Sequence, residues 1–290
     1  FPSGKTGEYT IPDYVTVLRN NALRYAKISK LTVGTGVHTI ARRAFYKCEN
    51  LKTLEFKEGG TNGLSIDPEA FYLTKNVTKL HLPARLTEMD LQCINSFIYL
   101  STLEVGAGGK HFTSKDNSIY DGVGRALLFA AMNISGEYEI PVGVQEIGPM
   151  AFNGRNNVTK VIIPSFVTKI SSAAFANCTG ITDVVITGNR NHNLTIDNNA
   201  FANCARINTI TFQSNNANKL DVGVITIGDG AFENIALLGT VVFEAGVNID
   251  SIGNRAFANN ANLHTVVYHE GCFVGTIGNA AFMGCAQLTE

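Results

Sequence analysis

The amino-acid sequence predicts an α/β-type repeat solenoid, a fold in which short and similar units stack along one axis. Two observations lead to this prediction. The pair Ala-Phe recurs at intervals of 23 to 31 residues wherever units adjoin, and apolar residues stand at fixed distances from each Phe. The pairs are Ala44-Phe45, Ala70-Phe71, Ala151-Phe152, Ala174-Phe175, Ala200-Phe201, Ala231-Phe232, Ala256-Phe257 and Ala281-Phe282, and Cys93-Ile94 takes the equivalent place in a further unit.

The strand of each unit follows its Ala-Phe pair. In the unit around Phe175, Ile170 lies five residues before the Phe, and Ile181, Val184 and Ile186 lie six, nine and eleven residues after it. The same four positions are apolar in the other units. The spacing Leu-x-x-Val-x-Ile ends in alternation, which predicts a strand with one buried face. A weaker unit with Leu18, Ala22, Ile28, Leu31 and Val33 comes first, so about ten units are predicted in all.

The corner and the return segment complete the unit. A small Ala beside a large Phe lets coils stack closely around a spine of Phe rings. Two residues after the Phe, many units carry a residue that accepts a left-handed turn. These are Gly154, Asn177, Asn203, Asn234, Asn259 and Gly284. A period of about 23 residues fits the leucine-rich repeat range of about 20–29. We therefore expect a right-handed leucine-rich-repeat solenoid with parallel strands on the concave face and mostly irregular return segments. A parallel β-helix, which repeats more strand per turn, is the alternative.

One interruption divides the array. Residues 107–140 break the period, and Asp121-Gly122 between two apolar runs is a hairpin signal. We expect an N-terminal repeat block at 1–106, a hairpin-type insertion at 107–140 and a C-terminal repeat block at 141–290, all in one continuous solenoid. The motif at Gly136–Pro141 repeats the one at Gly7–Pro12. The sequence therefore predicts a fragment of a longer array.

Composition and motifs favour binding over catalysis. A formal net charge of −1 gives no reason to expect a nucleic-acid partner, and the absence of an 18-residue apolar run predicts no membrane insertion in this fragment. No catalytic, cofactor or metal motif is present. Four of the six cysteines stand three residues after the Phe, where other units carry Thr74, Ile235 or Asn260. A column that accepts these residue types is expected to be a packing position with reduced thiols, and not a metal site.

The candidate site is formed by strand residues that point away from the core. Positions eight and ten after each Phe lie between inward positions, so they should form two ladders on the concave sheet. In the C-terminal block these ladders are largely apolar or hydroxylic, and we select Ile162, Val185, Thr209, Thr211, Thr240, Val242, Thr265 and Val267 as a protein-binding stripe. Equivalent N-terminal positions are Glu55, His81 and Glu104. The alternative interpretation is that β-branched residues simply favour strands.

The repeat resembles a known family. The unit Ile170-Ser171-Ser172-Ala173-Ala174-Phe175-Ala176-Asn177-Cys178-Thr179-Gly180-Ile181 is similar to those of BspA-like leucine-rich-repeat proteins. Segment 4–12 looks like that family's linker between repeat blocks, and the resemblance covers essentially the whole chain. It implies an extracellular or cell-surface, adhesin-like module that binds a host or microbial surface protein or a glycan, with no catalytic residues to carry over. A structural spacer that displays another domain, or an enzyme accessory region, is the alternative.

Overall fold

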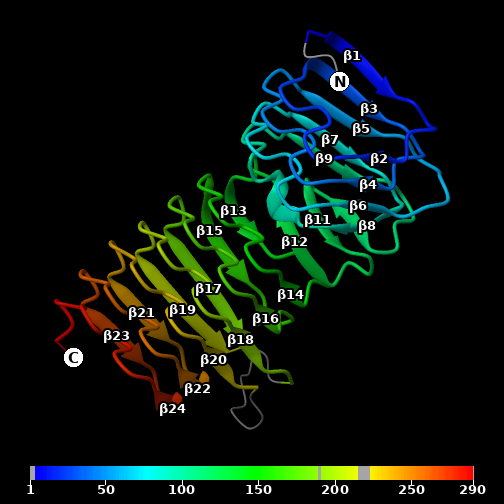
Figure 1. Ribbon diagram of the computed structural model, residues 1–290. Coiled ribbons are helices and arrows are strands. Elements are labelled where there is room, and N and C mark those ends of the chain that lie inside the picture. The colour runs from blue at the N-terminus through cyan, green and yellow to red at the C-terminus, as the bar shows by residue number, and fades with distance from the viewer. Residues whose placement is uncertain (1–3, 189–190, 215–222, 290) are drawn as a thin grey trace. The chain divides into compact units, whose positions relative to one another are not determined.

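A computed structural model describes residues 4–188, 191–214 and 223–289. The chain forms two compact units (Figure 1). The N-terminal unit comprises Phe1–Gly124 and Leu128–Asn133, and the C-terminal unit comprises Arg125–Leu127 and Ile134–Glu290. Each unit is a stack of coils built from parallel strands. The expectation of one continuous solenoid over blocks 1–106, 107–140 and 141–290 stays a prediction.

The N-terminal unit has two parallel sheets, with one strand from each coil in each sheet. The first sheet holds, in order, β1 (Thr6–Ile11), β3 (Lys27–Val33), β5 (Thr53–Phe56), β7 (Lys79–Leu82) and β9 (Thr102–Val105). The second holds β2 (Val17–Leu18), β4 (Thr39–Ile40), β6 (Leu64–Ile66) and β8 (Leu86–Met89). β10 (Phe112–Lys115) and β11 (Ser118–Asp121) then pair antiparallel around Asp116 and Asn117, both of which have positive φ.

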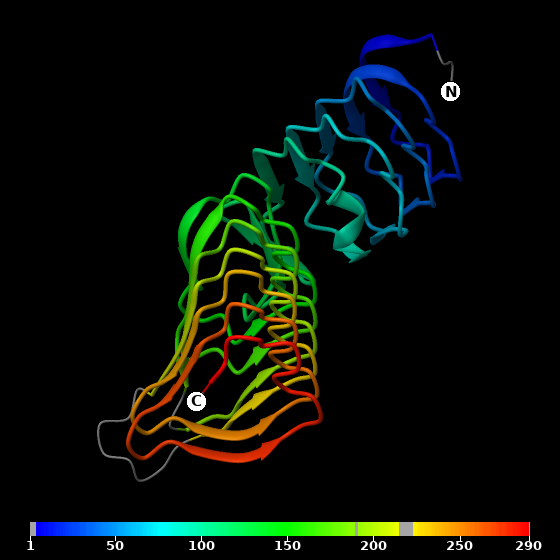
Figure 2. The same ribbon diagram turned by 90° about the vertical axis from the view of Figure 1, so that its left-hand side faces the viewer.

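The C-terminal unit repeats this plan over more coils, and Figure 2 shows how regularly they stack. Its first sheet, which we call the long-strand sheet, holds β13 (Gly136–Glu139), β15 (Val158–Ile163), β17 (Asp183–Gly188), β19 (Thr209–Ser214), β21 (Thr240–Phe243) and β23 (Thr265–Tyr268). The second parallel series runs through β14 (Glu146–Ile147), β16 (Lys169–Ile170), β18 (Leu194–Ile196), β20 (Ile225–Ile227), β22 (Asn248–Ile252) and β24 (Phe273–Ile277). β12 (Ala126–Ala130) contains residues of both units, and its first two residues pair with β14.

One expectation about the fold class is wrong. The α/β label fails because, among the described residues, the helical content is one 3₁₀ turn, η1 (Leu91–Ile94). The return segments are mostly irregular, as expected, but each contains a short second parallel strand, on which the apolar position five residues before the Phe lies. Ile170, for example, ends β16 and pairs with Ile147 and Ile196. The protein is therefore a β-solenoid with two strands in each full coil.

The Phe residues form the predicted spine. Neighbouring rings are stacked with centroids 4.7 Å apart for Phe152 and Phe175, 4.8 Å for Phe175 and Phe201, and 5.2 Å for Phe201 and Phe232. The backbone N–H of Phe201 donates to the carbonyl of Ala231 in the next coil at 2.7 Å. Equivalent hydrogen bonds join the corners of successive coils. Only a small side chain lets the corners approach so closely, which explains the Ala of each pair.

Left-handed residues shape the corner on both sides of the Phe. As predicted, residues two positions after it, including Asn177, Asn203 and Gly154, have positive φ. The structure adds a second left-handed position, two residues before the Phe, where Arg43 and Ala173 are found. Two left-handed residues in one corner interrupt any run of right-handed helical backbone, so this segment cannot form an α-helix.

Candidate functional site

The described residues contain no group of three or more His, Cys, Asp or Glu side chains placed to hold a metal ion. Among the same residues, no helix is long and apolar enough to span a membrane. The surfaces that remain as candidates are the outer face of the long-strand sheet, one polar pocket in the N-terminal unit and the corners of the coils.

The selected strand residues lie together on one face of the long-strand sheet. Each is half-buried, whereas the positions that flank them on β15, β17, β19 and β21, such as Val184 and Ile186, are buried in the core. On β23 the flanking Val266 is half-buried and Tyr268 is exposed. The ladder at ten residues after the Phe aligns Ile162, Val185, Thr211, Val242 and Val267 across four parallel pairings. The ladder at eight residues after the Phe aligns Lys160, Asp183, Thr209, Thr240 and Thr265 beside it. We call these ten residues the C-terminal sheet face.

Charge is confined to one end of the C-terminal sheet face. Lys160 Nζ lies 3.1 Å from Glu137 Oε2 on β13, and Asp183 accepts a hydrogen bond from Thr182. From β19 to β23 both ladders carry only Thr and Val. A partner that covers these three strands would therefore bury methyl groups and hydroxyls without having to desolvate a charge.

At two of the equivalent positions of the N-terminal unit, Glu55 and His81, the side chain lies close to an oppositely charged or titratable neighbour. Glu55 lies 3.5 Å from Lys30 Nζ and 3.1 Å from Lys79 Nζ, on the two neighbouring strands. The hydrogen bond from Lys79 is the main reason why the pKa of Glu55 is lowered. His81 Nε2 lies 3.5 Å from Glu58. The two units thus present faces of different character, as the change along the ladder predicted.

The cysteine column has a more specific role than packing. Cys178 Sγ donates to the carbonyl of Phe152 at 2.8 Å, and Cys204 Sγ donates to that of Phe175 at 3.0 Å. Thr74 donates in the same way to Phe45, and Asn260 to Phe232. The position therefore supplies a hydrogen-bond donor to the buried carbonyl of the preceding Phe. This rule accounts for Cys, Thr and Asn in one column, although Ile235 and Phe97 do not follow it.

We expect the buried thiols of the column to resist alkylation in the folded protein, unlike Cys285 at its half-buried end. All six cysteines are free, and Cys48 is buried, which raises the pKa of its thiol to about 12. Because the thiolate is the nucleophile, iodoacetamide at pH 8 should modify the half-buried Cys272 and Cys285 well before Cys48. Peptide mass spectrometry after timed quenching measures this order, and urea-unfolded protein is the control. Equal rates at Cys48 and Cys285 in the native state would contradict the burial of the column.

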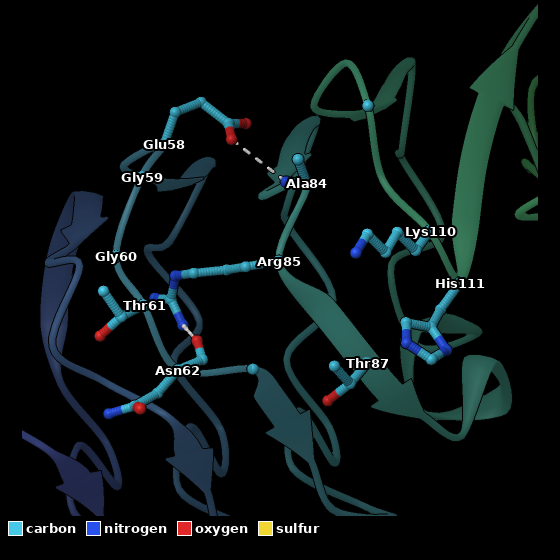
Figure 3. A pocket seen from close by; sticks show the side chains of 12 residues that line it. Glu58, Gly59, Gly60, Thr61, Asn62, Ala84, Arg85, Thr87, Lys110 and His111 are labelled. Carbon is cyan, nitrogen blue, oxygen red and sulfur yellow. Dashed lines mark hydrogen bonds between the residues drawn. The ribbon is translucent and has the colours of Figure 1, made fainter.

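A polar pocket of about 440 Å³ lies in the N-terminal unit beside loop 58–63 (Figure 3). Arg85 Nη1 donates to the carbonyls of Val37 at 2.8 Å and Asn62 at 3.3 Å, and Glu58 accepts from the backbone N–H of Ala84 at 3.1 Å. Lys110 and His111 are exposed on the opposite wall. Nη1 of Arg85 thus links the loop to the neighbouring coil, while its buried Nε has no hydrogen-bond partner among the described residues. No sequence motif marked this pocket.

Comparison with known proteins agrees with this geometry. Stacked coils with parallel strands and a Phe spine are the geometry of a repeat solenoid. A family model described as the BspA type leucine-rich repeat region, in six copies, matches residues 2–118, 127–221 and 216–290. The chain therefore belongs to the BspA-type leucine-rich-repeat family. A search of curated proteins found no match.

Solved structures of bacterial repeat proteins share the fold. A leucine-rich repeat protein from Eubacterium ventriosum is 18% identical, with a TM-score of 0.66, over 98% of this chain and 83% of that one. The pneumococcal vaccine antigen PcpA is 15% identical, with a TM-score of 0.65, over 94% of this chain and 78% of that one. A leucine-rich cell surface protein from Faecalibacterium prausnitzii is 18% identical, with a TM-score of 0.56, over 90% and 79%.

Proposed function

We propose that the protein is an adhesin-like binding module displayed outside the cell, and that it binds a surface protein through the C-terminal sheet face. The observation that supports this most directly is the run of uncharged, half-buried Thr and Val side chains across β19, β21 and β23. An interface core depleted of charge with hydroxyls beside it is typical of protein recognition. Strand propensity alone also predicts Val and Thr at these positions, and the substitutions described below separate the two explanations.

The location outside the cell rests on the relatives. Solved structures with this fold include a vaccine antigen and a cell surface protein. Membership of the BspA-type family fits a surface module of the same kind. The second candidate is a spacer that displays another domain. Stacking copies of one short unit is a simple way to build an elongated scaffold. A spacer needs no specific face, so substitutions on the C-terminal sheet face separate the two functions.

Replacing Val185 and Val242 with Lys should abolish binding while the fold persists. Both side chains are half-buried and point outward, so a long Lys side chain can extend into solvent. Val242 lies within the uncharged run and Val185 lies at its border on β17, and two added charges there are expected to weaken binding about 100-fold or more. The ligand is first identified on an array of purified matrix proteins and glycans, and affinity is then measured by surface plasmon resonance.

The matched control is Thr195→Lys with Thr226→Lys. These two residues are half-buried and point outward from β18 and β20, two neighbouring strands of the second parallel series in the same unit. Circular dichroism confirms folding of both double variants. If both variants bind the identified ligand as tightly as the wild type, the binding site does not lie on the C-terminal sheet face. Absence of any saturable ligand on the array would favour the spacer.

A further inference from the structure

Three tyrosines form an exposed ladder on the corners of the N-terminal unit. The centroids of Tyr25 and Tyr46 are 5.6 Å apart with an edge-on geometry, and those of Tyr46 and Tyr72 are 5.9 Å apart and stacked. Tyr25 is 45% exposed and Tyr72 is 43% exposed, so large aromatic area faces solvent in successive coils. Tyr46 and Tyr72 each directly follow a spine Phe.

The fold itself does not require aromatic residues here. In the C-terminal unit the residue directly after the spine Phe is Ala176, Ala202 or Ala258 in three coils, and each of these is buried. Those corners are instead closed by an asparagine ladder, in which Asn203 donates to Asn177 at 3.3 Å and Asn234 donates to Asn203 at 3.2 Å. A tyrosine at this position therefore adds exposed apolar surface that the C-terminal coils do without.

Arg and Lys side chains lie over the tyrosine rings. The guanidinium of Arg24 lies 4.6 Å from the centroid of Tyr25 and 5.2 Å from that of Tyr46, and Arg43 lies 5.4 Å from that of Tyr72. Lys47 Nζ lies 5.7 Å from the centroid of Tyr46. We call these six residues the tyrosine–arginine edge.

The surroundings of the tyrosine–arginine edge are electropositive. Corner segments 19–27, 41–50 and 67–73 carry six Lys and Arg against three Asp and Glu. Glu69 accounts for one of the acids, and it is shared between Arg42 at 2.7 Å and Arg43 at 2.9 Å. The excess of positive charge favours an acidic partner.

We propose that the tyrosine–arginine edge is a second binding surface, and that its partner is an acidic polypeptide segment. Tyr and Arg together are the residue types that carry most of the energy at protein interfaces. The arrangement disfavours a polysaccharide, because sugars stack on open ring faces. Here the faces are turned towards neighbouring rings and cations, and Arg24 donates to the hydroxyl of Tyr25 at 2.9 Å, which leaves the exposed ring edges for a partner. This surface is separate from the C-terminal sheet face and does not depend on its role.

The test uses the full chain and two fluorescein-labelled peptides. In one peptide glutamate alternates with leucine, and in the other lysine replaces each glutamate. Fluorescence anisotropy should show binding of the acidic peptide only, and that binding should weaken as salt rises. The double variant Tyr25→Ser, Tyr72→Ser should lose about tenfold or more in affinity. Tyr14→Ser is the control, since Tyr14 is 83% exposed in the same unit but is not part of the edge.

A second pair of substitutions separates charge from structure. Arg24→Gln with Lys47→Gln retains long side chains, so folding should be unaffected while both affinity and its dependence on salt fall. Val185→Lys with Val242→Lys should leave peptide binding unchanged, which keeps this proposal independent of the proposed function. Equal binding of the two peptides, or unchanged affinity in both edge variants, would overturn the proposal. Tyrosine-dependent binding of heparin without binding of the acidic peptide would replace it with a polysaccharide site.

Discussion

Phe201→Ala should lower the free energy of unfolding by about 3–5 kcal/mol, the usual cost of truncating a buried Phe. The ring is fully buried and stacks on Phe175 at 4.8 Å and on Phe232 at 5.2 Å. Removing it leaves a cavity that neither neighbouring coil can fill, because their corners are fixed by backbone hydrogen bonds to each other. The Phe201 N–H to Ala231 carbonyl bond, for example, does not depend on the side chain. The cavity should therefore persist, and the loss should lie near the upper end of that range.

Urea denaturation followed by circular dichroism measures this loss. Phe273→Ala on β24 is the matched control, since the same atoms are removed from a side chain that is 62% exposed. An exposed substitution of this kind is expected to change the free energy by about 0.5 kcal/mol or less. Similar midpoints for the two variants would show that Phe201 does not belong to the buried spine.

Asn260→Leu is the second substitution expected to have a large effect. Asn260 is fully buried, and its Nδ2 donates to the carbonyls of Phe232 at 3.0 Å and Phe257 at 2.9 Å. Its Oδ1 accepts from the backbone N–H of Ile235 at 2.7 Å. Leu has a similar volume but no polar atom, so it leaves these backbone groups buried without that partner. Each such group costs about 1–3 kcal/mol, and the total loss should reach about 3 kcal/mol.

Two further variants test the explanation. Asn262→Leu removes a single exposed hydrogen bond, to the carbonyl of Ala236, and should be close to neutral. Asn260→Cys should recover part of the loss, because Cys178 and Cys204 show that a thiol can donate to the preceding Phe carbonyl from this column. If the Cys and Leu variants lose equal stability in urea, the donor rule for the column is wrong.

Much of the fold could be predicted because apolar residues recur at regular intervals along the chain. Val184 and Ile186 are buried while Val185 between them is half-buried, as the alternation predicts. Asn177 and Gly154 have positive φ, as expected of residue types that tolerate it. The same alternation placed the residues of the C-terminal sheet face in the correct ladders. Their role in binding stays a prediction, since a strand face with this composition also forms for reasons of propensity.

The second strand of each coil could not be predicted in the same way. β16 spans only Lys169 and Ile170, which is too short to show alternation. The left-handed position two residues before the Phe could not be recognised from Arg43 or Met150, because these residue types are not typical of turns. In both cases the conformation is imposed by hydrogen bonds to the adjacent coil, such as that from the Met150 N–H to the Ser172 carbonyl at 3.2 Å. Local sequence preference is weak there, and the stacking of coils outweighs it.

The sequence by itself determined the repeat, the spine, the inward and outward strand positions and the family. Only the tertiary structure decided what those positions contact. Cys178 and Cys204 donate to carbonyls 26 and 29 residues earlier in the chain, and the rings of Tyr46 and Tyr72 meet across two coils. The physical reason is that each coil buries its polar and aromatic groups against its neighbours. Periodicity within one unit reveals which side chains face inward, but the stacking of units fixes which groups meet.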